Sequence, residues 1–221
     1  FSKASLIAFA FLQLFVASCK KKASEVKEQV ISASVTINAN ENFQTIQGFG
    51  AATVFRPSNG PLTNEELDRL FGKGNGQLGL NILRIRIATD DTWRALELAN
   101  AKGAVQRGAK ILASPWSPPA RFKTNNNLIG GSLKVDSSEA YAKYLNDFAN
   151  YMAANGAAVH AVSVQNEPDW DPNYESCVWT ALQMRDFLKN YGQLVTSTKL
   201  MAPELVNYNQ NYMNTILSDN A

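Results

Sequence analysis

Apolar residues recur along the chain in two alternating patterns. Short runs of small and β-branched residues predict strands at residues 45–52, 81–87, 110–114, 161–164 and 199–202. Apolar stripes spaced three and four residues apart predict helices at residues 63–71, 92–106, 138–155, 180–191 and 208–217. Each strand precedes a helix, and this alternation predicts a parallel sheet with helical crossovers.

Two architectures fit such a pattern, an open doubly wound sheet and an eight-stranded (β/α)8 barrel. The first turn, Gly48-Phe49-Gly50, lacks the third glycine of a dinucleotide-binding fingerprint, and no acidic residue ends the second strand. Polar and aromatic residues instead follow the strands, where a barrel enzyme gathers its active site. We therefore expect an α/β fold, a partial TIM barrel of about five βα units over residues 45–221.

The first residues follow a different pattern from the rest. Lys3 precedes an apolar run from Leu6 to Val16, which ends in Val16-Ala17-Ser18-Cys19. A run of this length suits a signal peptide better than a membrane span. Residues 1–19 therefore predict a lipoprotein-type signal peptide with lipidation at Cys19, although ordinary cleavage nearby would leave that cysteine incidental.

The next segments complete the expected organisation. Residues 20–32 are polar and predict a tether, and residues 33–37 alternate like a half-buried strand. We expect an exported protein, lipid-anchored to a bacterial membrane or secreted.

Composition narrows the classes of partner and cofactor. The net charge is +2 and charged residues make up 18% of the chain, so no nucleic-acid surface is expected. The two cysteines and the single His160 lack metal-ligand spacing, and we expect neither a metal nor a cofactor. A disulfide between Cys19 and Cys177 is not expected either, because Cys19 lies in the signal segment.

Candidate chemistry gathers where the fourth strand stops. Asn166 and Glu167 precede Pro168, which ends the ladder, and Trp170 follows closely. A carboxylic acid at the end of a buried strand, beside an aromatic ring, suits proton transfer to a sugar oxygen. The alternative is a strand-end glutamate that caps a helix or pairs with an arginine.

Four segments of the chain form a recognisable set of motifs in this order: Thr45-Ile46-Gln47-Gly48-Phe49-Gly50, Leu83-Arg84-Ile85-Arg86, Ser114-Pro115-Trp116-Ser117-Pro118-Pro119 and Ser163-Val164-Gln165-Asn166-Glu167-Pro168-Asp169-Trp170. Together they resemble glycoside hydrolase family 30, from about residue 34 to the end. The likeness is greatest to the bacterial glucuronoxylanase subgroup, and Tyr174-Glu175-Ser176-Cys177 and the loop at residues 127–131 add to it.

This resemblance implies a (β/α)8 barrel with a β-sandwich side domain, to which residues 33–44 would contribute an N-terminal strand. It also implies retaining hydrolysis by two glutamates, with Glu167 as the general acid/base. The family places the nucleophile after the seventh strand, so we expect it to lie beyond this N-terminal fragment. The full-length protein is expected to be a monomer that acts on a polysaccharide.

The resemblance also assigns substrate-binding roles. Asn166 would contact the sugar 2-hydroxyl, Trp116 and Trp170 would line the sugar site, Arg84 would lie at its floor, and Glu204 would belong to the cleft wall. Simpler roles stay open for four of these residues: a turn for Asn166, packing for the two tryptophans, and an ion pair with Glu204 or Glu167 for Arg84.

The resemblance thus implies an endo-β-1,4-xylanase acting on glucuronoxylan. Other family activities, β-glucosidase, glucosylceramidase or β-1,6-glucanase, are the alternatives among enzymes. A noncatalytic glycan-binding barrel is the alternative outside them.

Overall fold

The structure is a computed structural model that describes residues 34–38, 40–41, 43–54 and 60–218. It comprises two units, Phe1–Thr45 and Ile46–Ala221, which are treated separately below. In the first unit, residues 34–38 form no strand, and Val35 and Ile37 are exposed. The strand prediction at residues 33–37 is therefore wrong for the described part, because an alternating segment needs a ladder partner to become a strand. Its assignment to a side domain stays a prediction, and the expected signal peptide and tether lie outside the described residues.

The second unit is built on a parallel sheet whose strands follow the chain order β1-β2-β3-β4-β5. The strands are β1 (Gly50–Ala52), β2 (Ile82–Ile87), β3 (Lys110–Pro115), β4 (Val159–Ser163) and β5 (Lys199–Met201). A doubly wound sheet reverses its strand order at a switch point, and this sheet does not. The sheet is thus that of a partial TIM barrel, as the sequence predicts.

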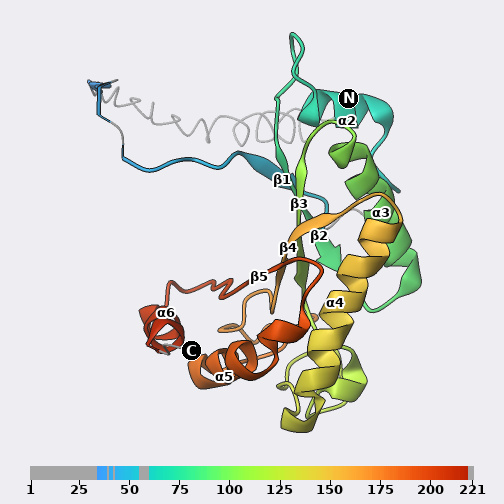
Figure 1. The fold of residues 1–221 in the computed structure, drawn as a ribbon, viewed down its shortest axis with the longest axis vertical. Coiled ribbons are helices and arrows are strands. Elements are labelled where there is room, and N and C mark those ends of the chain that lie inside the picture. Colours follow the sequence, from blue (N-terminus) through green and yellow to red (C-terminus); the bar gives the residue numbers. More distant parts are fainter. Residues whose placement is uncertain (1–33, 39, 42, 55–59, 219–221) are drawn as a thin grey trace, which may run out of the picture. The chain divides into compact units, whose positions relative to one another are not determined.

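Helices and short 3-10 turns connect the strands (Figure 1). The helices are α2 (Asn64–Phe71), α3 (Asp91–Val105), α4 (Ser138–Ala154), α5 (Ala181–Tyr191) and α6 (Gln210–Leu217), and the turns are η2 (Ala120–Phe122), η3 (Val135–Ser137) and η4 (Gly192–Leu194). Capping boxes begin α2 at Thr63 and α5 at Thr180. The first predicted strand is shorter than expected, because its register with β2 begins at Gly50, opposite Ile82.

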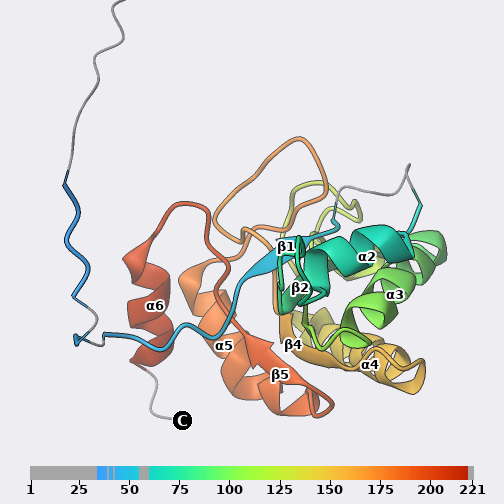
Figure 2. The same ribbon diagram turned by 90° about the horizontal axis from the view of Figure 1, so that it is seen from above.

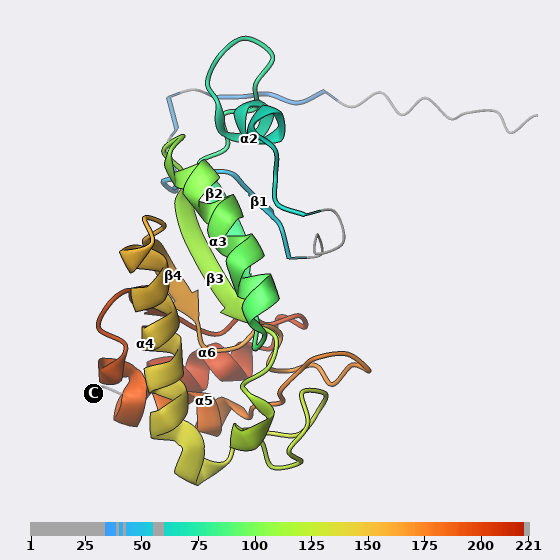
Figure 3. The ribbon, with the colours of Figure 1, turned by 90° about the vertical axis from the view of Figure 1, so that its right-hand side faces the viewer.

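One face of the sheet is covered by helices. In Figure 3, α3 and α4 both lie in front of the strands, and Figure 2 shows the same helices from above. Leu83, Ile85 and Ile87 of β2 belong to the buried core, and the alternating Arg84 and Arg86 therefore point to the other face.

Aromatic side chains fasten the helices to the end of β4. The Tyr141 ring of α4 lies 5.8 Å from the Phe187 ring of α5, centroid to centroid, and 6.2 Å from that of Trp179. The Tyr141 hydroxyl donates to the Val164 carbonyl oxygen at 2.7 Å, two residues before Asn166. The helical layer therefore fixes the backbone that leads into the candidate site.

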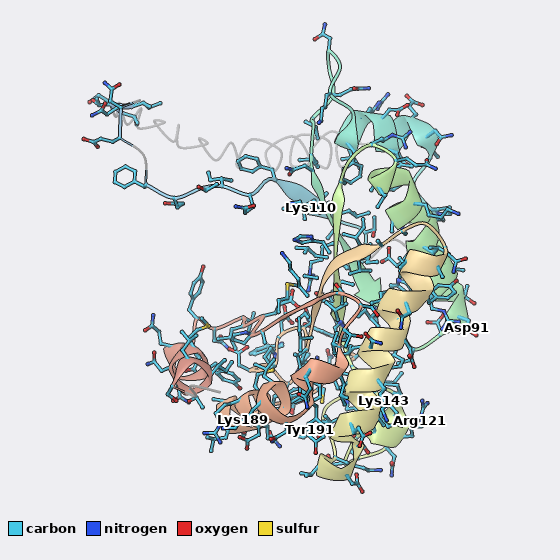
Figure 4. The ribbon with its side chains drawn as sticks, in the orientation of Figure 1. Asp91, Lys110, Arg121, Lys143, Lys189 and Tyr191 are labelled. Atoms are coloured by element: carbon cyan, nitrogen blue, oxygen red, sulfur yellow. The ribbon has the colours of Figure 1, made fainter. Side chains whose placement is uncertain are left out.

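The two ends of the sheet differ in what they present. Figure 4 marks them with Lys110, at the start of β3, and Arg121, in the turn that follows this strand. The predicted catalytic and substrate-binding residues all lie within or after the strands, toward the end marked by Arg121. Parallel strands bring their carboxyl ends to the same edge, which is where a barrel builds its site.

We predict that Gly103→Ala destabilises the protein although it lies within helix α3. Alanine normally stabilises a helix by about 1 kcal/mol over glycine. Here a Cβ atom would lie 2.3 Å from Leu67 Cδ1, and Leu67 is itself packed in the core. We expect a net loss of about 1–3 kcal/mol in the free energy of unfolding, measured by chemical denaturation. The exposed Lys102→Ala is the control, and a Gly103→Ala variant as stable as the parent would contradict this packing.

Candidate active site

The backbone after β4 is held between its two neighbours. The Asn166 amide donates to the Pro115 carbonyl oxygen, and the Glu167 amide donates to the Glu204 carbonyl oxygen, each at 2.9 Å. Glu167 has a φ of 48°, a left-handed conformation that costs a non-glycine residue free energy. Flanking hydrogen bonds of this kind are what maintain such a strained residue at a functional site.

Arg84 connects the ends of four strands. Its Nε lies 3.2 Å from both Ser114 Oγ and Glu204 Oε1, and its second terminal nitrogen donates to Asn166 Oδ1 at 2.6 Å. Ser114 Oγ also donates to Glu204 Oε1, at 3.0 Å. The structure thus pairs Arg84 with Glu204, one of the two partners the sequence left open.

Glu204 has one further feature. Its second oxygen, Oε2, is buried and has no hydrogen-bond partner among the described residues. A buried carboxylate oxygen without a donor is uncommon and costly. Glu204 also borders an open pocket of about 360 Å³, whose lining residues are Pro203, Glu204, Leu205, Tyr208, Asn209, Gln210 and Met213.

A second cluster lies beside Glu167. The Tyr174 hydroxyl donates to Glu167 Oε2 at 3.3 Å, and Glu175 forms an ion pair with Arg86. Desolvation raises the pKa of Tyr174, and the neighbouring Glu167 acts in the same direction. Tyr174 therefore keeps its proton near neutral pH and donates it to the carboxylate in a hydrogen bond.

The two predicted tryptophans occupy different environments. Trp116 is 5% exposed, and the guanidinium carbons of Arg84 and Arg86 lie 4.8 Å and 5.3 Å from its ring centroid. Trp170 is 48% exposed, and its amide donates to the Glu167 carbonyl oxygen at 3.1 Å. Of the two, Trp170 has the free surface that stacking on a sugar requires.

A fully buried carboxylate on helix α3 binds the strand ends that lead into the site. Glu97 of α3 accepts from the Thr53 hydroxyl at 2.6 Å, the Asn100 amide at 3.2 Å and the Arg86 backbone amide at 3.1 Å. These bonds join the helix to the ends of β1 and β2, so they fix the backbone that carries Arg86.

The structure therefore brings Glu167, Asn166, Arg84 and Glu204 into one contiguous network of hydrogen bonds. The predicted Cys19 lies outside the described residues. Cys177 is buried and free, and burial raises the pKa of its thiol to about 12, which suits an inert core residue.

Two partnerships do not follow from the sequence, those of Tyr174 with Glu167 and of Glu175 with Arg86. The sequence marks Tyr174 and Glu175 only as members of a motif, and the one signal of their role is that this motif follows closely after Glu167 in the chain.

The described residues lack two further kinds of feature. No group of three or more His, Cys, Asp or Glu side chains in them is arranged to hold a metal ion. None of their helices has both the length and the apolar character of a membrane span.

Comparison with known proteins points to one family. The sequence model of the glycosyl hydrolase family 30 TIM-barrel domain matches residues 76–210, more than half of the chain. The chain is 37% identical over 198 residues to glucuronoxylanase XynC of Bacillus subtilis strain 168, covering 86% of this chain and 46% of that protein. Weaker matches include glucosylceramidases and endo-1,6-β-D-glucanases.

Solved structures give the same grouping. The glycoside hydrolase family 30 subfamily 8 xylanase Xyn30A of Clostridium acetobutylicum superposes with a TM-score of 0.75 at 43% identity, over 83% of this chain and 49% of that one. A family 30 endoxylanase of Clostridium papyrosolvens C71 gives a TM-score of 0.68 at 34% identity, over 80% and 47%. The chain spans about half the length of these relatives.

We predict that the backbone of Glu167 is strained enough to be detected in stability measurements. Glu167→Gly and Glu167→Ala remove the same carboxylate, but only glycine adopts a φ of 48° without steric cost. The glycine variant should be more stable than the alanine variant by about 1 kcal/mol in chemical denaturation.

As a control, the same exchange between alanine and glycine is made where the backbone is helical, and there we expect alanine to be the more stable residue. Ala153 is exposed in helix α4, and Ala153→Gly should lower stability by about 1 kcal/mol. A Glu167→Ala variant that is more stable than Glu167→Gly would show that the left-handed conformation is not maintained.

Proposed function

The chain belongs to glycoside hydrolase family 30, and from this premise we propose that the protein is a retaining glycoside hydrolase acting on β-linked polysaccharide. The observation that carries the proposal is the environment of Glu167. Glu167 follows β4, and its carboxylate accepts a hydrogen bond from the Tyr174 hydroxyl. The preceding residue, Asn166, accepts a hydrogen bond from Arg84. We further propose glucuronoxylan as the substrate, in an endo-β-1,4-xylanase reaction.

In the proposed reaction, Glu167 acts first as an acid and then as a base. It protonates the glycosidic oxygen as the leaving sugar departs, and it later takes a proton from the water that releases the product. A second carboxylate forms the covalent glycosyl intermediate, and in retaining enzymes it lies about 5–5.5 Å from the first. By family resemblance we assign that role to a glutamate after a seventh strand, and we assign Glu204 to the cleft wall.

Asn166 is suited to bind the sugar next to the bond that breaks. Arg84 occupies the oxygen of its side-chain amide, at 2.6 Å. The NH2 group of that amide does not bond to Arg84, and it donates a hydrogen bond to the sugar 2-hydroxyl. Hydrogen bonds at that hydroxyl strengthen in the transition state, so the arginine supports catalysis by fixing the amide's orientation. Trp170 offers an exposed ring for stacking.

Several similar proteins support the choice of xylan. The matched proteins include a glucuronoxylanase and two xylanases at 34–43% identity. Glucosylceramidases and endo-1,6-β-D-glucanases match more weakly, and their reactions are the alternatives within the family. A barrel that binds glycan without cleaving it is the remaining alternative.

The decisive experiment measures sugar release by the full-length protein from glucuronoxylan, undecorated xylan and a β-glucan. We expect cleavage of glucuronoxylan, and a loss of about 10²- to 10⁴-fold in kcat for Glu167→Gln, because the amide cannot transfer the proton. Glu139→Gln is the matched control, since Glu139 is an exposed residue of α4 that pairs only with Lys143 in the described contacts.

The other outcomes separate the alternatives. Cleavage of β-glucan instead of xylan would show that the protein has another activity of the family. Glycan binding without cleavage would leave a noncatalytic barrel. Full activity in Glu167→Gln would remove Glu167 from the mechanism.

We also propose that the protein is exported and held at a bacterial membrane by a lipid on Cys19. The support is the apolar run that ends in Val16-Ala17-Ser18-Cys19. In the expressing bacterium, Cys19→Ser should move the protein from the membrane fraction to the soluble exported fraction. An unchanged distribution between the fractions would exclude the anchor.

A further inference from the structure

A buried ammonium group joins three loop segments beside the candidate acid/base. Lys123 follows the turn η2, and its residue is 0% exposed. Its Nζ donates to Ser117 Oγ and to the Leu128 carbonyl oxygen, each at 3.0 Å, and to the Ser176 carbonyl oxygen. These acceptors use all three donors of the ammonium group.

The acceptors belong to segments that are distant in sequence. Ser117 follows β3, Leu128 lies in the loop between η2 and η3, and Ser176 lies between β4 and α5. Figures 2 and 3 show the yellow-green loop after β3 and the orange loop after β4 side by side. The Ser176 amide also donates to the Leu128 carbonyl oxygen at 3.0 Å, which joins the two loops through their backbones.

The described hydrogen-bond acceptors of this ammonium are all neutral oxygens. Burial lowers the pKa of Lys123, although Cys177, Asp171 and Glu175 act in the opposite direction. A buried charge costs free energy, and its hydrogen bonds offset that cost only in part. Stability alone is therefore a poor reason for an ammonium here, whereas three directed bonds fix the relative positions of the loops.

One of these loops carries the partners of the candidate active site. We call residues 171–178 the clamp loop. Tyr174 and Glu175 directly precede Ser176 in it, and they contact Glu167 and Arg86 respectively. The carbonyl that the lysine binds is thus two residues from the hydroxyl that donates to Glu167.

We propose that Lys123 is a positioning residue for the reaction at Glu167, which it serves by fixing the clamp loop so that Tyr174 donates to the carboxylate. This inference rests on the proposed hydrolase function. It predicts that the loss of the ammonium group lowers turnover through Tyr174, beyond any effect on folding.

The test compares Lys123→Met with Lys134→Met in the full-length protein. Lys134 lies in the same loop, and its Nζ donates to the Arg121 carbonyl oxygen at 3.1 Å and to Asn126 Oδ1 at 2.9 Å, with both acceptors in residues 121–126. The measurements are kcat and KM on glucuronoxylan, well below the melting temperature of each variant. Hydrogen exchange at the Ser176 and Val178 amides is measured alongside.

For Lys123→Met we expect kcat to fall about 10- to 100-fold with KM changed less than about threefold, as a small displacement of a catalytic contact produces. Exchange at the clamp loop should accelerate. Lys134→Met should change neither quantity. In a Tyr174→Phe background, Lys123→Met should lower kcat less than about threefold further, because the contact it supports is already gone.

Several results would overturn the proposal. An unchanged kcat in folded Lys123→Met would leave the lysine with a structural role only. If Lys123→Met lowered kcat as much in the Tyr174→Phe background as in the parent, the lysine would not act through Tyr174. If Lys123→Met does not fold, Ser117→Ala removes one acceptor only. It should accelerate exchange and lower kcat more mildly, and no change in either would refute the inference.

The exchange measurement also separates this inference from the proposed function. A parent protein that cleaves no polysaccharide would refute the hydrolase assignment and, with it, a role in turnover. Accelerated exchange in Lys123→Met would then still show that Lys123 fixes the clamp loop. Unchanged exchange would refute this structural role as well.

Discussion

The site depends on a single guanidinium that reaches from one strand to the next three. Arg84 leaves the interior face of β2 and bonds Ser114 of β3, Asn166 after β4 and Glu204 after β5. A planar group with five fixed donors suits this task better than an ammonium, because its bonds hold their directions relative to one another. The strand ends are thereby fixed relative to one another, and they position the segment that carries Glu167.

The loops beyond the strand ends supply side chains that contact the site residues on the strands. Glu167 lies at a strand end, but its hydroxyl partner comes from Tyr174 in the clamp loop. The same loop delivers Glu175 to Arg86, whose guanidinium carbon lies 4.2 Å from the Trp93 ring centroid. The site is therefore built from a rigid sheet edge and a loop stapled to it, a division common among barrel enzymes.

The elements that sequence predicts well are those set by local chemistry. Both capping boxes form, because a threonine and a residue three positions later satisfy each other's backbone regardless of what surrounds them. The parallel order of the strands followed from the alternation of strand and helix. The segment at residues 33–37 shows the limit, since a period of two specifies a strand only where another strand is present to pair with it.

Tertiary contacts decide the remainder. Whether Arg84 pairs with Glu204 or Glu167 depends on the register of β4 and β5, which no local pattern encodes. The burial of Trp116 under two arginines and the position of Tyr174 depend on loop conformations. Lys123 looked like any surface lysine in the sequence, and only the fold shows that its charge is buried.

The left-handed backbone at Glu167 has a consequence for how this position changes over evolutionary time. Glycine, asparagine and aspartate adopt such a conformation at low cost, and a glutamate pays for it. If Glu167 has its proposed role, selection for the carboxylate is what keeps the costlier residue in place. In a descendant that had lost that role, drift would favour the three less costly residues, so the residue at this one position would record whether the role persists.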